Sequence, residues 1–241
     1  PVDMHTYTPL YPGYTGELLH KLYPGAPILT YYDPYPEWKF YQPQTYKLND
    51  IYKMTKLGTR GTVAGVIDNF IVSAYHVLAT GTFGDYEVPN TPCGYRLLTS
   101  ENIIGHTSYF TEPAHYEREN TFTLDRDIAL ATHNLPMHDL CLMFANGSYE
   151  LRECDVIGVV SAVFKDMVYV APLREVMPET PVYMTGSTSG TVMLKPIGRV
   201  TTYTLQFKFG NTYLNVNIRN GWVFEGTAKP GDSGAPVFVL H

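Results

Sequence analysis

Residues 229–236 have the residue types of a loop that presents a nucleophile. Their sequence, KPGDSGAP, places Ser233 among residues that favour a tight turn, and an apolar run follows. A serine hydroxyl at such a turn projects toward a substrate, while two backbone N–H groups converge to hold an oxyanion. We predict these donors at Gly231 and Ser233, because a glycine permits a close approach that a side chain would block.

A serine is a weak nucleophile by itself and needs a general base that a third group orients. His76, in the segment SAYHVL, follows a β-rich run and is the predicted base. Asp127, in the segment DIAL, is the predicted orienting acid. Asp139, which repeats the pattern of an aspartate before apolar residues, and Asp125, two residues away, remain alternatives. The expected chemistry is acyl transfer, which requires no metal or cofactor.

These three motifs resemble those of the chymotrypsin-like serine proteases, in which histidine, aspartate and serine follow one another in this order. KPGDSGAP is similar to the family's nucleophile loop, SAYH to its histidine segment and DIAL to its aspartate segment. The resemblance implies an all-β fold of two antiparallel Greek-key barrels. It also implies a catalytic triad of His76, Asp127 and Ser233.

Further roles near the serine follow from the same resemblance. Asp232 is expected to fix the oxyanion loop through a local hydrogen bond or ion pair. Thr227, Ala228 and Lys229 are expected in the wall of the primary substrate pocket, where a threonine could bond a Gln or Glu side chain of the substrate. The pocket assignment depends on the register of Thr227, which the sequence leaves open.

Two departures separate the chain from the secreted digestive enzymes of this family. It begins with Pro-Val-Asp-Met instead of Ile-Val-Gly-Gly, and Val77 and Lys229 stand where those enzymes have cysteines. The chain is most similar to the disulfide-free proteases that positive-strand RNA viruses cut from polyproteins. A cytosolic or bacterial protease is the alternative branch.

The expected function is a serine endopeptidase that processes a viral polyprotein, with its own precursor among its substrates. The expected location is intracellular, in the host cytoplasm, or on the virus particle. The alternative function is a structural or virion-associated protein that retains a protease fold after its activity is spent or lost.

Composition excludes several other classes. Of 241 residues, 44% are hydrophobic and 17% are charged, which is typical of a globular protein. No apolar run is long enough for a membrane helix. The net charge is −6 and no basic stripe occurs, so nucleic acid is not a predicted partner. The three cysteines, Cys93, Cys141 and Cys154, have no zinc-site spacing, and we expect three reduced thiols.

Four regions are predicted along the chain. Residues 1–50 hold 8 of the 18 prolines and 9 of the 20 tyrosines. Because proline disfavours helices and central strands, we expect an extended arm that packs on this protein or on a partner. Residues 51–171 form the first barrel with His76 and Asp127, residues 172–181 a linker, and residues 182–241 a second barrel with Ser233.

Short β-rich runs separated by turn residues fill both predicted barrels. The expected strands are residues 62–67, 70–74, 95–98, 103–107, 128–131, 156–164, 167–171, 182–185, 191–194, 200–209, 213–218 and 237–240.

Only residues 234–241 follow Ser233, enough for one strand, whereas the family has further strands there, including one that pairs with the substrate backbone. We therefore expect an incomplete second barrel. Its last strands would come from a longer polypeptide, a separate chain or the N-terminal arm, or would be missing from a retained fold.

Overall fold

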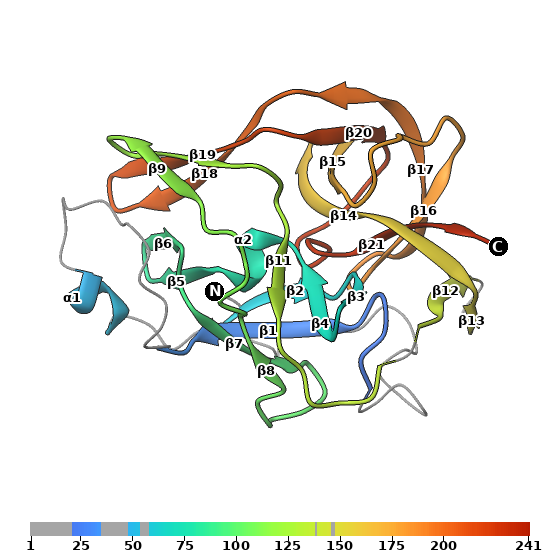
Figure 1. Ribbon diagram of the computed structural model, residues 1–241, viewed down its shortest axis with the longest axis horizontal. Coiled ribbons are helices and arrows are strands. Elements are labelled where there is room, and N and C mark those ends of the chain that lie inside the picture. The colour runs from blue at the N-terminus through green and yellow to red at the C-terminus, as the bar shows by residue number, and fades with distance from the viewer. Residues whose placement is uncertain (1–20, 35–47, 54–57, 138, 146–147) are drawn as a thin grey trace.

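The computed structural model describes residues 21–34, 48–53, 58–137, 139–145 and 148–241. In these residues the only helices are α1 (Leu48–Tyr52) and α2 (Tyr75–Leu78), and neither is long enough to cross a membrane. All other regular structure is β-strand, arranged as a first half that is a partly open barrel and a second half that is a closed barrel (Figure 1). The predicted all-β, two-barrel fold is confirmed.

The first half contains two small sheets that curve around one core. One sheet has the order β2-β1-β7-β8 and the other β11-β4-β3, and a bridge between Thr107 and Ala131 joins them. The strands are β1 (Pro27–Tyr32), β2 (Thr59–Thr62), β3 (Gly65–Ile67), β4 (Phe70–Ser73), β7 (Cys93–Leu97), β8 (Gly105–His106) and β11 (Ala129–Ala131). The β3–β4 turn at Asp68 and Asn69, between the expected strands 62–67 and 70–74, has positive φ at both residues, as a tight hairpin requires.

Strand β1 corrects the expectation for residues 1–50. It lies in the middle of its sheet, between β2 and β7, and its residues from Pro27 to Thr30 are buried. A proline was expected to prevent this, but Pro27 is the first residue of the strand, where proline is tolerated. Of the predicted arm, residues 1–20 and 35–47 lie outside the described residues.

A third sheet joins the two halves. Its order is β5-β6-β18-β19-β10-β9, and the hairpin β18–β19 reaches it from the second half, as Figure 1 shows. Its strands are β5 (Thr80–Phe83), β6 (Tyr86–Pro89), β9 (His115–Arg118), β10 (Thr121–Leu124), β18 (Tyr203–Phe209) and β19 (Thr212–Ile218). Strands β10 and β19 run parallel, so residues about 90 positions apart lie side by side just before Asp127.

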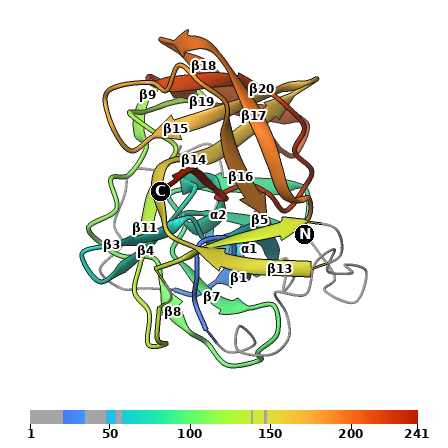
Figure 2. The same ribbon diagram turned by 90° about the vertical axis from the view of Figure 1, so that its right-hand side faces the viewer.

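The second half is a closed antiparallel barrel with the order β14-β15-β20-β17-β16-β21 (Figures 1 and 2). Its strands are β14 (Cys154–Phe164), β15 (Met167–Pro172), β16 (Val182–Gly186), β17 (Gly190–Val200), β20 (Gly221–Glu225) and β21 (Pro236–Leu240). Trp222, Phe224 and Met184 are fully or almost fully buried in its core.

The barrel's closure corrects the predicted boundary and the predicted gap. Strand β14 pairs with β21, and β15 pairs with β20, so two strands that were predicted in the first barrel close the second one. The expected linker, residues 172–181, therefore lies inside the barrel segment. The expectation of missing last strands is wrong, because β14 and β15, which precede Ser233 in the chain, supply the strands that were expected after it.

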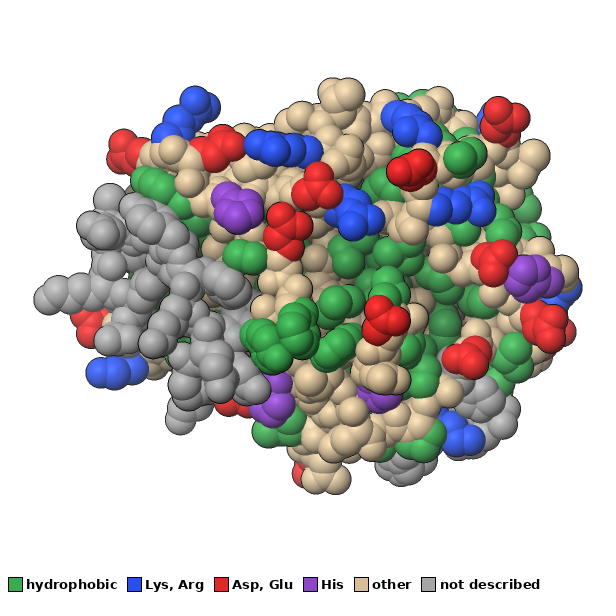
Figure 3. All heavy atoms as spheres, in the orientation of Figure 1, with side chains coloured by type: hydrophobic (Ala, Val, Ile, Leu, Met, Phe, Trp, Pro, Cys, Tyr) green, Lys and Arg blue, Asp and Glu red, His purple; other side chains and the backbone are tan. Residues whose placement is uncertain are grey.

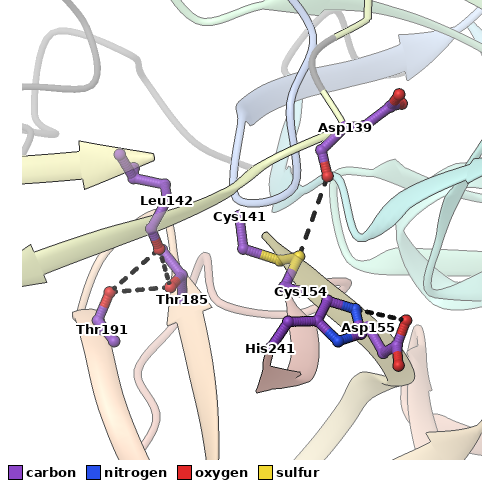
Figure 4. The surroundings of a disulfide bond; sticks show 8 residues. All are labelled: Asp139, Cys141, Leu142, Cys154, Asp155, Thr185, Thr191 and His241. Atoms are coloured by element: carbon purple, nitrogen blue, oxygen red, sulfur yellow. Dashed lines mark hydrogen bonds and ion pairs between the residues drawn. A yellow bond between two sulfur atoms is a disulfide. The ribbon is translucent and has the colours of Figure 1, made fainter. Parts of the chain in front are cut away.

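A hairpin of β12 (Cys141–Ala145) and β13 (Ser148–Arg152) leads into β14. Cys141 and Cys154 form a disulfide there, and the Leu142 carbonyl accepts a hydrogen bond of 2.6 Å from Thr185 of the barrel (Figure 4). The prediction of three reduced thiols is wrong for this pair, because the hairpin folds back and brings the two cysteines together. Cys93 is a buried free thiol, and burial raises its pKa.

Candidate active site

Two paired strands of the first half bring His76 and Asp127 together. His76 lies in the short helix α2, which begins two residues after β4 ends at Ser73. Asp127 lies two residues before β11, and β11 pairs with β4 so that Ala129 faces Ser73. Residues that are 51 positions apart in the sequence are thereby placed at the same end of one strand pair.

Asp127 holds His76 through both carboxylate oxygens. Its Oδ2 is 2.7 Å from Nδ1 of the imidazole, and its Oδ1 accepts a hydrogen bond of 3.1 Å from the His76 backbone N–H. The Asp127 side chain is fully buried, whereas the His76 side chain is 22% exposed. The carboxylate therefore fixes the ring and leaves its other nitrogen, Nε2, as the one available for proton transfer.

Burial and charge shift the pKa values of His76 and Asp127 in opposite directions. Burial lowers the pKa of His76, but the charge and hydrogen bond of Asp127, with a smaller contribution from Glu87, outweigh it and leave that pKa raised. Burial likewise raises the pKa of Asp127, but His76 and the hydrogen bond from Ser161 outweigh it and leave that pKa lowered. Both shifts favour an ionised carboxylate beside an imidazole that accepts a proton readily.

The second half supplies a third contact to Asp127 that sequence reasoning missed. Ser161, in β14, donates a hydrogen bond of 2.6 Å to Asp127 Oδ2, and the Tyr203 hydroxyl donates one of 2.8 Å to the Ser161 oxygen. Ser161 and Tyr203 are both buried. One signal was available: Ser161 is the only hydroxyl in the apolar run of residues 157–163.

The two alternative acids lie elsewhere. Asp125 is 48% exposed and bonds Asn220 at 2.8 Å. Asp139 is exposed and lies beside the Cys141–Cys154 disulfide (Figure 4). Only Asp127, of the three candidates, contacts the His76 ring.

Residues 229–235 form the tight turn that was predicted around Ser233. Gly231 and Gly234 have φ values of 99° and 89°, which side-chain-bearing residues rarely adopt. A Cβ atom on Gly234 would also lie 2.0 Å from the Ser73 hydroxyl and 2.3 Å from the Thr62 carbonyl oxygen. Glycine is therefore required where the nucleophile loop passes against β2 and β4.

Thr62 holds the nucleophile loop from the first half. Its backbone N–H donates a hydrogen bond of 2.9 Å to the Ser233 carbonyl, and its hydroxyl donates one of 2.7 Å to the Gly231 carbonyl. With both carbonyls bound, the N–H groups of Gly231 and Ser233 donate to no acceptor among the described residues. These are the two donors that were predicted for an oxyanion.

Asp232 is fully buried and accepts four hydrogen bonds from uncharged groups. The backbone N–H groups of Thr188 and Ser189 bind Oδ1 at 2.9 and 3.1 Å. The Ser189 hydroxyl and the Lys229 backbone N–H bind Oδ2 at 2.5 and 2.8 Å. Asp232 thus ties the nucleophile loop to the β16–β17 turn, a local role of the kind predicted for it.

His76 and Ser233 line one hollow of about 490 Å³. No hydrogen bond joins the Ser233 hydroxyl to the His76 ring in the described structure, and such contacts often tighten only when a substrate binds. Most of the other lining comes from β14 and β18, with the side chains of Val163, Phe164 and Leu205 among them.

One edge of β14 beside this hollow is unpaired. Strand β21 pairs with β14 as far as Val159, and the backbone of Val160 exchanges hydrogen bonds with residues 234 and 235. From Ser161 to Phe164 that edge has no partner strand among the described residues. An unpaired edge can accept an extended peptide as an additional strand.

The predicted pocket wall at Thr227, Ala228 and Lys229 is not part of this hollow. Thr227 and Lys229 are exposed, and Ala228 packs partly against the barrel core. Their role as a substrate pocket remains a prediction.

Comparison with known proteins gives no further identification: no family model, no curated protein and no solved structure matches the chain. The resemblance to chymotrypsin-like serine proteases therefore stays a prediction from the sequence motifs.

Proposed function

We propose that this protein is a serine endopeptidase. The observation that carries the proposal is that Ser233, at a tight turn, lines one hollow together with His76, whose ring is held by the buried carboxylate of Asp127. In the same turn, the backbone N–H groups of Gly231 and Ser233 donate to no acceptor among the described residues.

The proposed reaction uses the same groups in both halves of the cycle. His76 Nε2 takes the proton of Ser233 as its oxygen attacks the peptide carbonyl, and Asp127 stabilises the imidazolium that forms. The N–H groups of Gly231 and Ser233 hold the negative oxygen of the tetrahedral intermediate. His76 then protonates the leaving amine, and water repeats the sequence to release the acyl group from Ser233.

We further propose that the substrate binds as an extended strand along residues 161–164 of β14. In the family that the motifs resemble, a strand after the serine has this role. Here β14 precedes the serine and lies next to β21, so the chain order of the second barrel would be rearranged relative to that family. The apolar side chains of Val163, Phe164 and Leu205 predict apolar substrate side chains in the hollow.

The disulfide removes one argument for the viral branch, since the chain is not free of disulfides. Viral polyprotein processing stays a prediction from the motifs alone. The intracellular location also stays a prediction, and the cysteines no longer support it, because disulfides are typical of oxidising compartments.

Digestion of a diverse peptide mixture tests the proposed function. We expect cleavage at internal bonds, with apolar residues enriched on one side of the cut, and no cleavage by the Ser233→Ala variant. The Ser148→Ala variant, which removes the hydroxyl of an exposed residue in β13 outside the hollow, should keep the same cleavage pattern and a rate within about twofold of the wild type. A folded wild-type chain that cleaves no peptide would contradict the proposal and favour a retained fold without activity.

A further inference from the structure

A second hollow, of about 890 Å³, lies outside the candidate active site. Its walls come from the loop before β11, the segment after β15, the end of β17 and the turn between β19 and β20. Four of the chain's eight arginines line it: Arg126, Arg174, Arg199 and Arg219. The hollow beside Ser233, by contrast, is lined by no arginine or lysine of the described chain.

Two of these guanidinium groups have no carboxylate partner among the described residues. Arg174 donates a hydrogen bond of 3.1 Å to the Val176 carbonyl, and Arg199 donates one to the Glu175 carbonyl. Both side chains are exposed, and each guanidinium has further N–H groups available for a ligand. Backbone carbonyls thus orient the two arginines without neutralising them.

The other two arginines have weak ion pairs, and Arg126 also donates a hydrogen bond of 3.1 Å to the Pro172 carbonyl. Arg126 lies 3.5 Å from the carboxylate of its neighbour Asp125, and Arg219 lies 3.7 Å from Glu117. All four of these groups are between 44% and 64% exposed, and exposed pairs of this kind contribute little. A ligand with a stronger charge can therefore compete for both guanidinium groups.

The residues that line the hollow have a positive net charge, although the net charge of the whole chain is negative. Its lining has four arginines against two carboxylates, those of Asp125 and Glu175, which gives a formal charge of +2, whereas the whole chain has −6. Figure 3 shows Lys and Arg side chains interspersed with acidic ones along the upper part of one face, where β19, β15 and β20 run in Figure 1.

We propose that this hollow binds a compact anion of the phosphate class that carries two or more negative charges. Guanidinium groups match phosphate oxygens in pairs of parallel hydrogen bonds, and several of them can share one polyvalent anion. A single carboxylate would satisfy only one of the four arginines.

The lining favours a small phosphate compound over a nucleic acid strand. Single-stranded nucleic acids bind through basic grooves that also present exposed aromatic rings for base stacking. Trp222 is the one aromatic residue in the described lining, and it is only 1% exposed. The described lining therefore provides positive charge for phosphate groups but no exposed aromatic ring for base stacking. Binding at this hollow does not depend on the proposed peptidase activity.

Calorimetric titration with pyrophosphate, at an ionic strength held constant with sodium chloride, tests the proposal. We expect saturable binding with a stoichiometry of one. The double variant Arg174→Gln/Arg199→Gln should bind about tenfold more weakly or worse, because it loses charge-assisted hydrogen bonds. An unchanged thermal unfolding transition without ligand verifies that this variant is folded.

The matched control is the double variant Arg118→Gln/Arg152→Gln, which removes the same charge from exposed positions outside the hollow. It should bind pyrophosphate like the wild type. Equal weakening in both double variants, or no saturable binding by the wild type, would overturn the proposal. Binding of a single-stranded oligonucleotide through Arg174 and Arg199, without binding of pyrophosphate, would also overturn it and point to a nucleic acid partner.

Discussion

The two halves of the molecule each hold their site residues with help from the other half. In the first half, His76 and Asp127 come together through the β4–β11 pairing, and Ser161 of the closed barrel adds a hydrogen bond. In the closed barrel, the nucleophile loop is bound by Thr62 of the first half. The candidate site therefore exists only when both halves are folded and docked.

The two halves differ in the groups that bind their buried aspartates. Asp127 in the first half is paired with a titratable ring, whereas Asp232 in the closed barrel is bound by four uncharged donors. A buried charge with a proton-accepting partner is suited to a proton-transfer step, and a buried charge with neutral partners is suited to fixing a loop. Under the proposed peptidase function, Asp127 has a chemical role and Asp232 a structural one.

The largest expected effect comes from Asp127→Asn. The substitution preserves the shape but removes the charge that orients His76 and stabilises its protonated form. We expect the rate of peptide hydrolysis to fall about 10⁴-fold, as in a well-studied serine protease with the equivalent change. Steady-state kinetics on one peptide measures it.

Asp125→Asn and Asp139→Asn are the matched controls, since neither residue contacts His76. Both should retain the wild-type rate within about twofold. A loss as large as that of Asp127→Asn in either control would contradict the assignment of the acid.

The next largest expected effect is a loss of stability on substitution at the contact between the halves. Gly234→Ala places a Cβ against Ser73 and Thr62 at a positive φ, so the free energy of unfolding should fall by about 3 kcal/mol. Gly198→Ala is the control, because a Cβ there meets no atom within 4 Å. Urea unfolding measures both, and equal stability of the two variants would argue against close docking at Gly234.

The disulfide should stabilise the fold by as much as Gly234→Ala destabilises it, or by less. Replacing Cys141 and Cys154 by serine should lower the free energy of unfolding by about 3 kcal/mol, because their 13-residue separation closes a loop of moderate length. Urea unfolding with and without a thiol reductant measures it. Reductant should destabilise the wild type and leave the double variant unchanged, since Cys93 has no disulfide partner. A wild type that is insensitive to reductant would contradict the Cys141–Cys154 disulfide.

The smallest expected effect is on the pH profile. The proposed base must be unprotonated, so activity should fall as pH decreases through the pKa of His76, which lies above its usual 6.5. Glu87→Gln removes one of the charges that raise this pKa and should move the midpoint to lower pH, with little loss of maximal rate. Glu150→Gln, an exposed change in β13, should leave the midpoint in place. A midpoint that Glu87→Gln raises or leaves unchanged would contradict the assigned electrostatics.

The two groups of this pair each stabilise the fold, but over different ranges of pH. The raised pKa of His76 stabilises the fold below about 6.5, and this contribution is lost as pH rises through the folded-state value. The lowered pKa of Asp127 stabilises the fold above its usual 3.8, and this contribution is lost as pH falls through the folded-state value. Stability attributable to the pair is therefore greatest between these limits.

Local sequence predicted the parts of the site that depend on local chemistry. Ser233, Gly231 and His76 lie in short motifs whose turn residues and flanking β-runs can be read directly, and Asp127 was preferred over two neighbours that the structure places elsewhere. Ser161 and Tyr203 were not found, because their contact with Asp127 depends on how the two halves dock, and no local pattern encodes that docking.

The barrel boundary was mispredicted for a physical reason. Strand pairing in an antiparallel barrel is set by long-range registers, and the β14–β21 pairing joins residues more than 75 positions apart. The proline-rich segment 172–181 indicated a linker by composition, but it connects two strands of the same barrel. The disulfide was missed in the same way, because the fold and not the spacing brings Cys141 to Cys154.

Labelling with a fluorophosphonate probe tests the central claim most directly, because the probe reacts with a serine only where a base and an oxyanion site activate it. We expect the folded chain to be labelled at Ser233, as located by mass spectrometry of the modified peptide. We also expect no labelling of Ser233→Ala and slow labelling of His76→Ala. A folded wild-type chain that the probe fails to modify at Ser233 would contradict the proposed nucleophile.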